Sequence, residues 1–493
     1  MMSMPLSPLA PVRRWILLVA ALLLSACGQE PARPKVALIG VDAATWSVID
    51  PLLAAGRLPH MAALIERGSR SVLTKPSAFD ASPVLWATIM TGTLPETHGI
   101  LNFARSQGGE LSVFASSDRK VPALWNMVDT RRGTSGVLGV WNTWPAEPVA
   151  GYVVSDRFAH SLYKHNYASR GVDESWGITW PEALSEELAS FALEPDAIRR
   201  DDVQMLGEFS DSEWLELRYG DKRDGPTVGN GLVALKYGWQ ATESVAAASL
   251  HMLQNHPQPD LFVIFLELPD RVGHHFWHAY EPELVDGGAD EVEAQWRERW
   301  SEMVPRSYER VDQWIGRFVA ELDEDTTIII VSDHGMQSTG YAGGSLGDLS
   351  RVHRSGKHHD EGILIAAGPA IAPGVETPMH IVDVAPLVLA SMGLPGSQQF
   401  EGRLAEELLA EGFRAEHPQG VARTEPPVAP AQHAAAPEGL DVDYLKQLKA
   451  LGYIDASGEQ TDSWRSDGDS VLAPESRETA EKLAEEAGIP DGS

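Results

Sequence analysis

Carboxylate and imidazole side chains recur where apolar, β-rich runs of this sequence end. The runs KVALIGV, LFVIFLELP and TTIIIVS each lead into an aspartate, and GKHHDEGILIAA carries two histidines just before another apolar run. Such mixed sets bind borderline divalent ions, zinc in first place, with manganese or iron as the alternatives. The candidate ligands are Asp42, Asp270, His274, Asp333, His334 and one of His358 and His359. Six other histidines are interpreted as ordinary surface or core residues: His60, His98, His160, His251, His256 and His380.

A set of this size is enough for two divalent metal ions. A pair of ions about 4 Å apart suits in-line displacement at phosphorus, because one activates the attacking oxygen and the other steadies the leaving or non-bridging oxygens. The attacking oxygen would come from a hydroxyl, and the stretch FDASPVLWATIMTG offers Ser82, Thr88 and Thr91. A serine needs an adjacent base or metal to become a nucleophile.

Ser82 has the most favourable position of the three hydroxyls. It begins a predicted helix, with Pro83 suited to the first turn, and the amino end of a helix favours a phosphoryl anion. A plain helix cap would have the same placement, so only the metals distinguish the two interpretations. Thr88 and Thr91 are expected within or at the end of that helix, where their hydroxyls bond to backbone carbonyls.

The elements that must position these residues form an α/β pattern. Apolar strands are expected over residues 36–41 and 363–366, and two further apolar β-rich runs lead from Leu261 into Asp270 and from Thr326 into Asp333. Helices are expected over 46–67, 230–254 and 306–322. Continuous apolar strands alternating with helices indicate a mainly parallel central sheet with helices on both faces. Because ligands bind at the carboxyl ends of such strands, three aspartates delivered there form one site.

The N-terminus has the pattern of an exported lipoprotein. Two arginines precede a short apolar run that ends in LSAC, and Cys27 is the only cysteine of the chain. The run is short for a membrane span and suits a signal peptide. We therefore expect residues 1–26 to be a signal peptide and an acylated Cys27 to hold the protein on a bilayer of the cell envelope, on the periplasmic or extracytoplasmic side.

The remaining segments divide by composition. After a tether over 27–34, a catalytic domain is expected over 35–414, with residues 155–229 as a cap insertion over the sheet edge. Residues 415–440 read as a Pro/Ala linker, 441–454 as a short amphipathic helix, and 455–493 as an acidic, disordered tail. The net charge of −31 argues against nucleic acid as a partner, although a small phosphorylated substrate remains compatible.

Several motifs together resemble the alkaline phosphatase superfamily, in particular its type I phosphodiesterase/nucleotide pyrophosphatase branch. They run in the expected order over about residues 36–403: GVDAATW, SPVLWATIMTGTLPETHGI, ELPDRVGHH, VSDHGM, GKHHDEGILIAAGP and HIVDVAPLVLASMGLP. The resemblance implies an alkaline phosphatase-like fold. It also implies one metal held by Asp270, His274 and His358, and a second held by Asp42, Asp333, His334 and the nucleophile Ser82. His358 is preferred because the family places that ligand four residues before the glycine that is Gly362 here.

The function expected from these observations is metal-dependent hydrolysis of a phosphodiester or phosphomonoester through a phosphoseryl intermediate on Ser82. A phosphoethanolamine-type headgroup transferase and a phosphonate hydrolase are alternatives, and a non-catalytic lipid-anchored binding protein is a weaker one. A sulfatase is disfavoured, since PVLW follows Ser82 without the arginine of that group. Leu85 stands where nucleotide pyrophosphatases have an asparagine, so Asn142, Asn102 or backbone N–H groups are the candidates for that phosphate contact. The oligomeric state is open.

Overall fold

The computed structural model describes residues 33–107, 110–159, 176–223, 231–285, 294–340 and 355–426, and Leu445. The signal peptide with Cys27, the linker beyond residue 426, the acidic tail and all but Leu445 of the predicted helix 441–454 lie outside the described residues. These predictions therefore stay predictions.

A nine-stranded sheet forms the centre of the molecule, in the order β13-β2-β12-β9-β1-β8-β5-β6-β7. The strands β9, β1, β8, β5 and β6 are mutually parallel, whereas β12 runs antiparallel to both of its neighbours, β9 and β2. The mainly parallel α/β sheet predicted from the sequence is thus confirmed. The strands are β1 (Val36–Val41), β2 (Ser69–Thr74), β5 (Ser135–Leu138), β6 (Gly151–Val154), β7 (Thr179–Trp180), β8 (Leu261–Leu266), β9 (Thr327–Val331), β12 (Glu361–Ala367) and β13 (Met379–His380).

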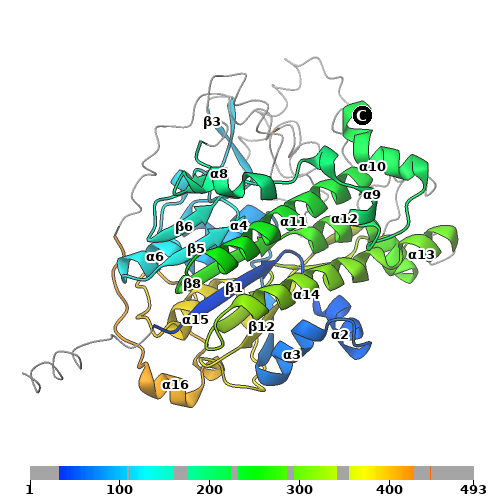
Figure 1. Ribbon diagram of the computed structural model, residues 1–493. Helices are drawn as coiled ribbons and strands as arrows, with labels where there is room; N and C mark the ends of the chain where they lie inside the picture. Colours follow the sequence, from blue (N-terminus) through cyan, green and yellow to red (C-terminus); the bar gives the residue numbers. More distant parts are fainter. Residues whose placement is uncertain are drawn as a thin grey trace, which may run out of the picture.

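Helices cover both faces of this sheet (Figure 1). Alternate residues of β1 point to opposite faces, and each set joins a separate core: Ala37, Ile39 and Val41 one, Val36 and Leu38 the other. Burial on both faces explains why the strands are apolar without alternation. The longer helices are α2 (Trp46–Ala54), α3 (Pro59–Arg67), α4 (Ser82–Thr91), α6 (Leu124–Thr130), α10 (Asp211–Arg223), α11 (Gly231–Asn255), α12 (Leu268–Tyr280), α13 (Ala294–Trp300), α14 (Met303–Glu321) and α15 (Val384–Ser391).

The helix predicted over 46–67 is wrong as a single element, because it is divided into α2 and α3. Gly56 lies between them with φ +69°, a left-handed conformation that ends a helix readily. Among the described residues no single helix is long and apolar enough to cross a membrane, and only this bent α2–α3 pair meets the length and composition for one. Both helices bury side chains such as Ile49 and Leu64 in the core beneath α14.

The segment predicted as a cap over the sheet edge is described over 155–159 and 176–223. Its helix α10 packs along α11. The helices α8 (Leu184–Leu188), α9 (Arg200–Val203) and α10 bury apolar side chains in the core that α11 and α14 share. The segment expected as a linker is described to residue 426, and there it contacts the body. Glu425 forms a buried ion pair with Arg131 at 2.5 Å, and α16 (Glu411–Glu416) extends past residue 414.

Candidate metal centre

Two of the candidate aspartates are positioned by neighbouring parallel strands. Gly40 of β1 is in register with Val331 of β9, and Asp42 and Asp333 each follow two residues later. The turn after Asp42 is held by the Tyr308 hydroxyl, which accepts a hydrogen bond from Thr45 N–H and donates one to the Ala43 carbonyl, both at 3.2 Å. The two carboxylates therefore meet at the carboxyl edge of the sheet, as the sequence predicted.

Asp270 reaches the same edge from a helix rather than from a strand end, so this part of the prediction is wrong. Strand β8 ends at Leu266, and Asp270 lies in the first turn of α12. The helix begins this early because Leu268 and Pro269 can occupy its first turn, where proline loses no hydrogen bond. Four residues separate Asp270 from His274, which places both on one helical face. Their Oδ1 and Nε2 atoms are 3.1 Å apart.

The two remaining histidines come from a small antiparallel hairpin of β10 (Gly335–Ser338) and β11 (Gly356–His359). His334 directly precedes β10. His358 pairs with Met336, and its side chain is buried against the His334 ring, with the two ring centroids 3.6 Å apart. Because side chains alternate along a strand, His359 faces the other way, and its Nδ1 accepts a hydrogen bond from Glu361 N–H. His358 is therefore the member of the pair that lies with the other candidates.

Five of the six candidate ligands converge in two groups that share His334, and the sixth, His274, has its Nε2 3.1 Å from His358 Nε2. The His334 Nε2 is 3.4 Å from Asp42 Oδ1 and 3.5 Å from Asp333 Oδ2. On the other side, His358 Nε2 is 3.5 Å from Asp270 Oδ1. The donor atoms of Asp42, Asp333 and His334 lie within 4.8 Å of one another, and so do those of Asp270, His334 and His358. Separations above 3 Å leave room for an ion about 2 Å from each donor.

Backbone carbonyls fix the tautomers of two of these histidines. The Nδ1–H of His334 donates to the Gly335 carbonyl and that of His274 donates to the Gly356 carbonyl, both at 2.9 Å. Each ring therefore carries a proton on Nδ1 and turns its Nε2 toward the carboxylates. This is the usual outer contact of a metal-binding histidine.

The charges of the site are unbalanced without a cation. Burial, together with repulsion from Asp333 and Asp270, raises the pKa of Asp42 well above its usual value. Burial also raises the pKa of Asp333, and it lowers the pKa of His334 to about 4. For Asp270, the neighbouring His274 and His358 outweigh burial and hold the pKa well below its usual value. Burial thus disfavours the negative charge of Asp42 and Asp333, and a divalent ion would neutralise that charge.

The polar atoms at the centre support the same assignment. Within the described part of the chain, no hydrogen bond of normal geometry reaches Asp42 Oδ1, either oxygen of Asp270 or Asp333, His334 Nε2 or Ser82 Oγ, and all are buried. Leaving one such group unsatisfied costs about 1–3 kcal/mol. The convergence of the Asp and His donors in two groups fits divalent metal ions held by oxygen and nitrogen donors.

Ser82 is the first residue of α4, at the same edge of the sheet. Strand β2, which leads into α4, is parallel to β1 because both run antiparallel to the direction of β12. One turn after Ser82, the Trp86 ring packs on Phe265 at 5.0 Å and covers Gly40, where an added Cβ would lie 2.4 Å from the ring. The start of α4 is therefore held over the ends of β1 and β8.

The other hydroxyls of this helix have local partners. Thr88 Oγ1 donates to the Val84 carbonyl at 3.0 Å and Thr91 Oγ1 to the Ala87 carbonyl at 2.7 Å, as predicted. Leu85 is fully buried in the core.

The two asparagines considered for the phosphate contact differ in position. Asn142 is buried with φ +60°, and its Nδ2 donates to the Pro83 carbonyl in the first turn of α4. The side-chain oxygen of Asn102 instead accepts a hydrogen bond from Phe103 N–H in a separate loop. Only Asn142 thus contacts the helix that carries Ser82.

Sequence reasoning missed Lys75. Its side chain is fully buried, and its Nζ lies 2.6 Å from Asp80 and 2.8 Å from Asp360, while it donates to the Phe79 carbonyl at 3.1 Å. Asp80 precedes Ser82 by two residues and Asp360 follows His358 by two. Lys75 therefore joins the loop that leads to Ser82 to the hairpin that carries His358. A single lysine in an apolar context gives no sequence signal for this.

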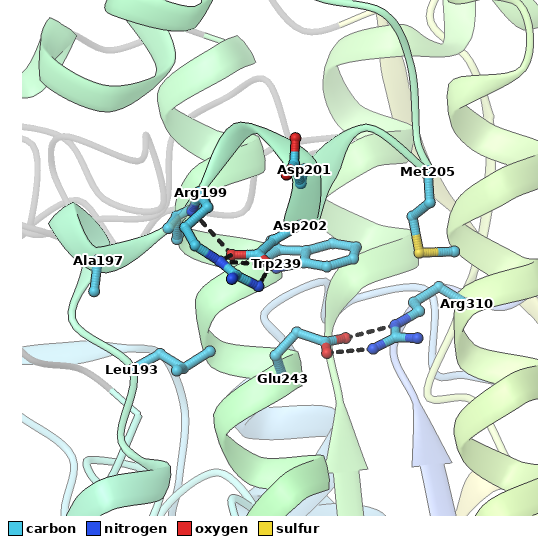
Figure 2. A pocket seen from close by; sticks show the side chains of 10 residues that line it. Leu193, Ala197, Arg199, Asp201, Asp202, Met205, Trp239, Glu243 and Arg310 are labelled. Atoms are coloured by element: carbon cyan, nitrogen blue, oxygen red, sulfur yellow. Dashed lines mark hydrogen bonds and ion pairs between the residues drawn. The ribbon is translucent and has the colours of Figure 1, made fainter.

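A cavity of about 490 Å³ on the helical face is a separate feature (Figure 2). Its lining comes from the inserted segment and from α11 and α14. Four of its charged groups form two pairs: Arg310 binds Glu243 through two contacts of 2.8 and 2.5 Å, and Arg199 binds Asp202. None of the candidate metal ligands lines it. The catalytic chemistry therefore belongs to the sheet edge and not to this cavity.

Comparison with known proteins agrees with the geometry. Residues 36–417 match the family model described as type I phosphodiesterase / nucleotide pyrophosphatase. No curated protein matches the sequence significantly. Among solved structures, phosphonoacetate hydrolase from Sinorhizobium meliloti 1021 is 16% identical with a TM-score of 0.36, over 62% of this chain and 57% of that one. Human ectonucleotide pyrophosphatase/phosphodiesterase 5 is 13% identical with a TM-score of 0.44, over 76% of this chain and all of that one.

The family match over residues 36–417, and not these structural likenesses, identifies the family. The family is metal-dependent, and the two Asp/His groups are the candidate metal-binding residues. The chain belongs to the type I phosphodiesterase/nucleotide pyrophosphatase family and is a phosphoric ester hydrolase.

Proposed function

We propose that this protein hydrolyses a small phosphodiester or phosphomonoester through a phosphoseryl intermediate on Ser82, with two divalent metal ions, zinc in first place. The observation that carries the proposal is the convergence of the two Asp/His groups at the edge where α4 begins with Ser82. Asp42, Asp333 and His334, with Ser82, would hold one ion. Asp270, His274 and His358 would hold the other.

When bound, the ions would supply Lewis-acid polarisation and neutralise charge that develops on phosphoryl oxygens. The Ser82 oxygen attacks phosphorus, its bond to phosphorus forms, and the bond to the leaving alcohol breaks. The positive end of the α4 dipole favours the phosphoryl group at this position. Water then cleaves the Ser82–phosphate bond and releases phosphate or its monoester. The buried Leu85 replaces the asparagine of the nucleotide pyrophosphatases, so the proposal does not favour nucleotides.

The test uses purified protein that lacks residues 1–27, with its metal content measured by mass spectrometry. We expect turnover of p-nitrophenyl phosphate or bis-p-nitrophenyl phosphate, restored by zinc after chelation. Ser82→Ala should abolish turnover and keep most of the metal, Ser82→Thr should restore part of it, and a phosphoserine peptide containing Ser82 should be trapped on acid quenching. Thr91→Ala is the matched control, since its hydroxyl bonds only to local groups, and it should keep its activity.

Full activity of Ser82→Ala would refute the nucleophile, and activity without divalent metal would refute the metals. Preferred turnover of a phosphonate ester would instead support the phosphonate hydrolase alternative. Transfer of the phosphoryl headgroup to an added alcohol in place of water would support the transferase alternative.

We further propose that Cys27 is acylated and anchors the protein to a bilayer of the cell envelope. The supporting observation is the apolar run before LSAC, which holds the only cysteine. The full-length protein should fractionate with membranes and incorporate labelled palmitate, and Cys27→Ser should do neither. Equal membrane association of the two would contradict the anchor.

A further inference from the structure

A second cluster of metal-binding side chains lies outside the catalytic edge. Glu187 of α8, His251 in the last turn of α11, and His256 just past the end of α11 place their donor atoms within 4.8 Å of one another. The Nε2 atoms of both histidines are 2.7 Å from the same oxygen, Glu187 Oε1. We propose that these three side chains form a peripheral site for a borderline divalent cation such as zinc.

The cluster is remote from the catalytic centre. An added Cβ at Gly231, the first residue of α11, would lie 3.1 Å from His275, beside the catalytic His274. His251 follows twenty residues later on the same helix, which at 1.5 Å per residue is about 30 Å away. Metal at this cluster would therefore not take part in the chemistry at Ser82. Its effect would be to join α8 of the inserted segment to the end of α11 (Figure 1).

The donors have the types and the freedom that a cation needs. Two imidazoles and a carboxylate are a usual zinc set, with water in the fourth position. The present spacing of 2.7 Å is that of direct hydrogen bonds, whereas donors about 2.0–2.1 Å from a tetrahedral ion lie about 3.3 Å apart. The side chains would have to separate by about half an ångström. Their exposed fractions of 24%, 31% and 36% allow this without disturbing the core.

The contact between Asn255 and His251 determines which nitrogen of His251 carries the proton and is therefore important for binding of a cation. Its Nδ2 contacts His251 Nδ1 at 3.1 Å and donates to the His251 carbonyl at 2.9 Å, which keeps the His251 proton on Nε2. Coordination through Nε2 moves that proton to Nδ1, so the position of Asn255 must then provide an acceptor. An aspartate there would provide one, in the carboxylate–histidine arrangement common at zinc sites. Asn255→Asp should therefore strengthen binding.

The test titrates Zn²⁺ into the full-length protein after its catalytic sites are loaded, by calorimetry, with phosphoesterase activity followed in parallel. Wild type should bind one further equivalent with micromolar affinity, and its Tm should rise on binding. His256→Ala and His251→Ala should each weaken this binding at least tenfold with unchanged activity, and Asn255→Asp should strengthen it. Glu186→Gln, a neighbouring exposed carboxylate on the same helix, is the control and should bind as wild type does.

No further equivalent in wild type, or the same affinity in both histidine variants, would overturn the proposal. If Asn255→Asp weakened binding, the coordination through His251 Nε2 would be wrong. Because activity is measured separately, the result is independent of whether the catalytic proposal for Ser82 holds.

Discussion

Replacing the buried Lys75 by methionine tests how the nucleophile is positioned. The change keeps the length and the apolar stem of the side chain and removes the charge that Asp80 and Asp360 share. Asp80 is 8% exposed and would become an uncompensated buried carboxylate, whereas Asp360, at 43%, can be solvated. Breaking a buried ion pair costs about 3–5 kcal/mol, and the exposure of Asp360 places Lys75→Met near the lower end, about 3 kcal/mol.

Catalysis should fall more than metal binding. Among the described residues, Lys75 pairs with Asp80 and Asp360 and not with a candidate ligand, but it fixes the loop that ends at Ser82. A displacement of the reacting atom by about 1 Å costs about 100-fold in rate. We therefore expect kcat to fall by one to two orders of magnitude, with KM changed little and the metal content unchanged.

The assay combines urea unfolding, steady-state kinetics and metal analysis. Lys35→Met is the matched control, because Lys35 pairs with Asp323 at the surface, with exposed fractions of 25% and 52%. An exposed pair contributes about 0–1 kcal/mol, and its loss should leave kcat unchanged. Lys75→Met/Asp80→Asn should recover part of the lost stability. Equal stability losses for the two single variants, or normal kcat in Lys75→Met, would refute the reasoning.

Three further changes probe the packing of α4, the protonation of its neighbour and the metals. Gly40→Ala places a Cβ 2.4 Å from the Trp86 ring, so it should lower the free energy of unfolding by about 1–3 kcal/mol and remove most of the activity. Gly412→Ala, with nothing within 4 Å of the added Cβ, is the control and should change neither the Tm nor turnover. Burial lowers the pKa of His98 to about 3, so the stability that depends on neutral His98 is complete above pH 6.5, and the free energy of unfolding falls by about 3 kcal/mol by pH 4. Urea unfolding at the two pH values should show a smaller fall for His98→Gln than for wild type. Chelation should lower the Tm, and zinc at a thousand times its Kd should restore about 4 kcal/mol of the free energy of unfolding. Asp333→Asn removes one buried carboxylate, so after chelation this variant should have a higher Tm than wild type.

The strand-end residues could be predicted because their position depends on local pattern alone. An apolar run buried on both faces identifies a parallel strand, and the residue that follows it must lie at the ligand-binding edge, which placed Asp42 and Asp333 correctly. Asp270 follows a similar run, but the helix begins at Leu268, and a residue pair such as Leu-Pro suits a loop or a first turn equally well. The hydrophobic pattern alone therefore could not show whether Asp270 lies in a loop or in the first turn of a helix.

Residues whose role depends on pairing between distant segments could not be predicted. The contact of Lys75 with Asp360 exists because β2 lies antiparallel to β12, and nothing in either segment specifies that partner. His251 and His256 also could not be singled out from the sequence, because their role depends on Glu187, which α8 places against them. Tertiary packing, and not local sequence propensity, determines the partners of Lys75 and of the two histidines.

The metal ligands and the nucleophile Ser82 are held in place by different structural elements. Asp42, Asp333 and the Asp270–His274 pair are fixed by the strand ends and by one helical turn of α12, elements buried in the core that α14 covers. Ser82 depends instead on α4, which packs through Trp86 in the opposite core, and on the loop that Lys75 holds. Because the two supports lie on different faces of the sheet, damage to one need not transmit to the other. Substitutions that displace the start of α4 or the loop before it should therefore lower turnover in a protein that still carries its metals. Substitutions at the strand ends should lower turnover and metal content together.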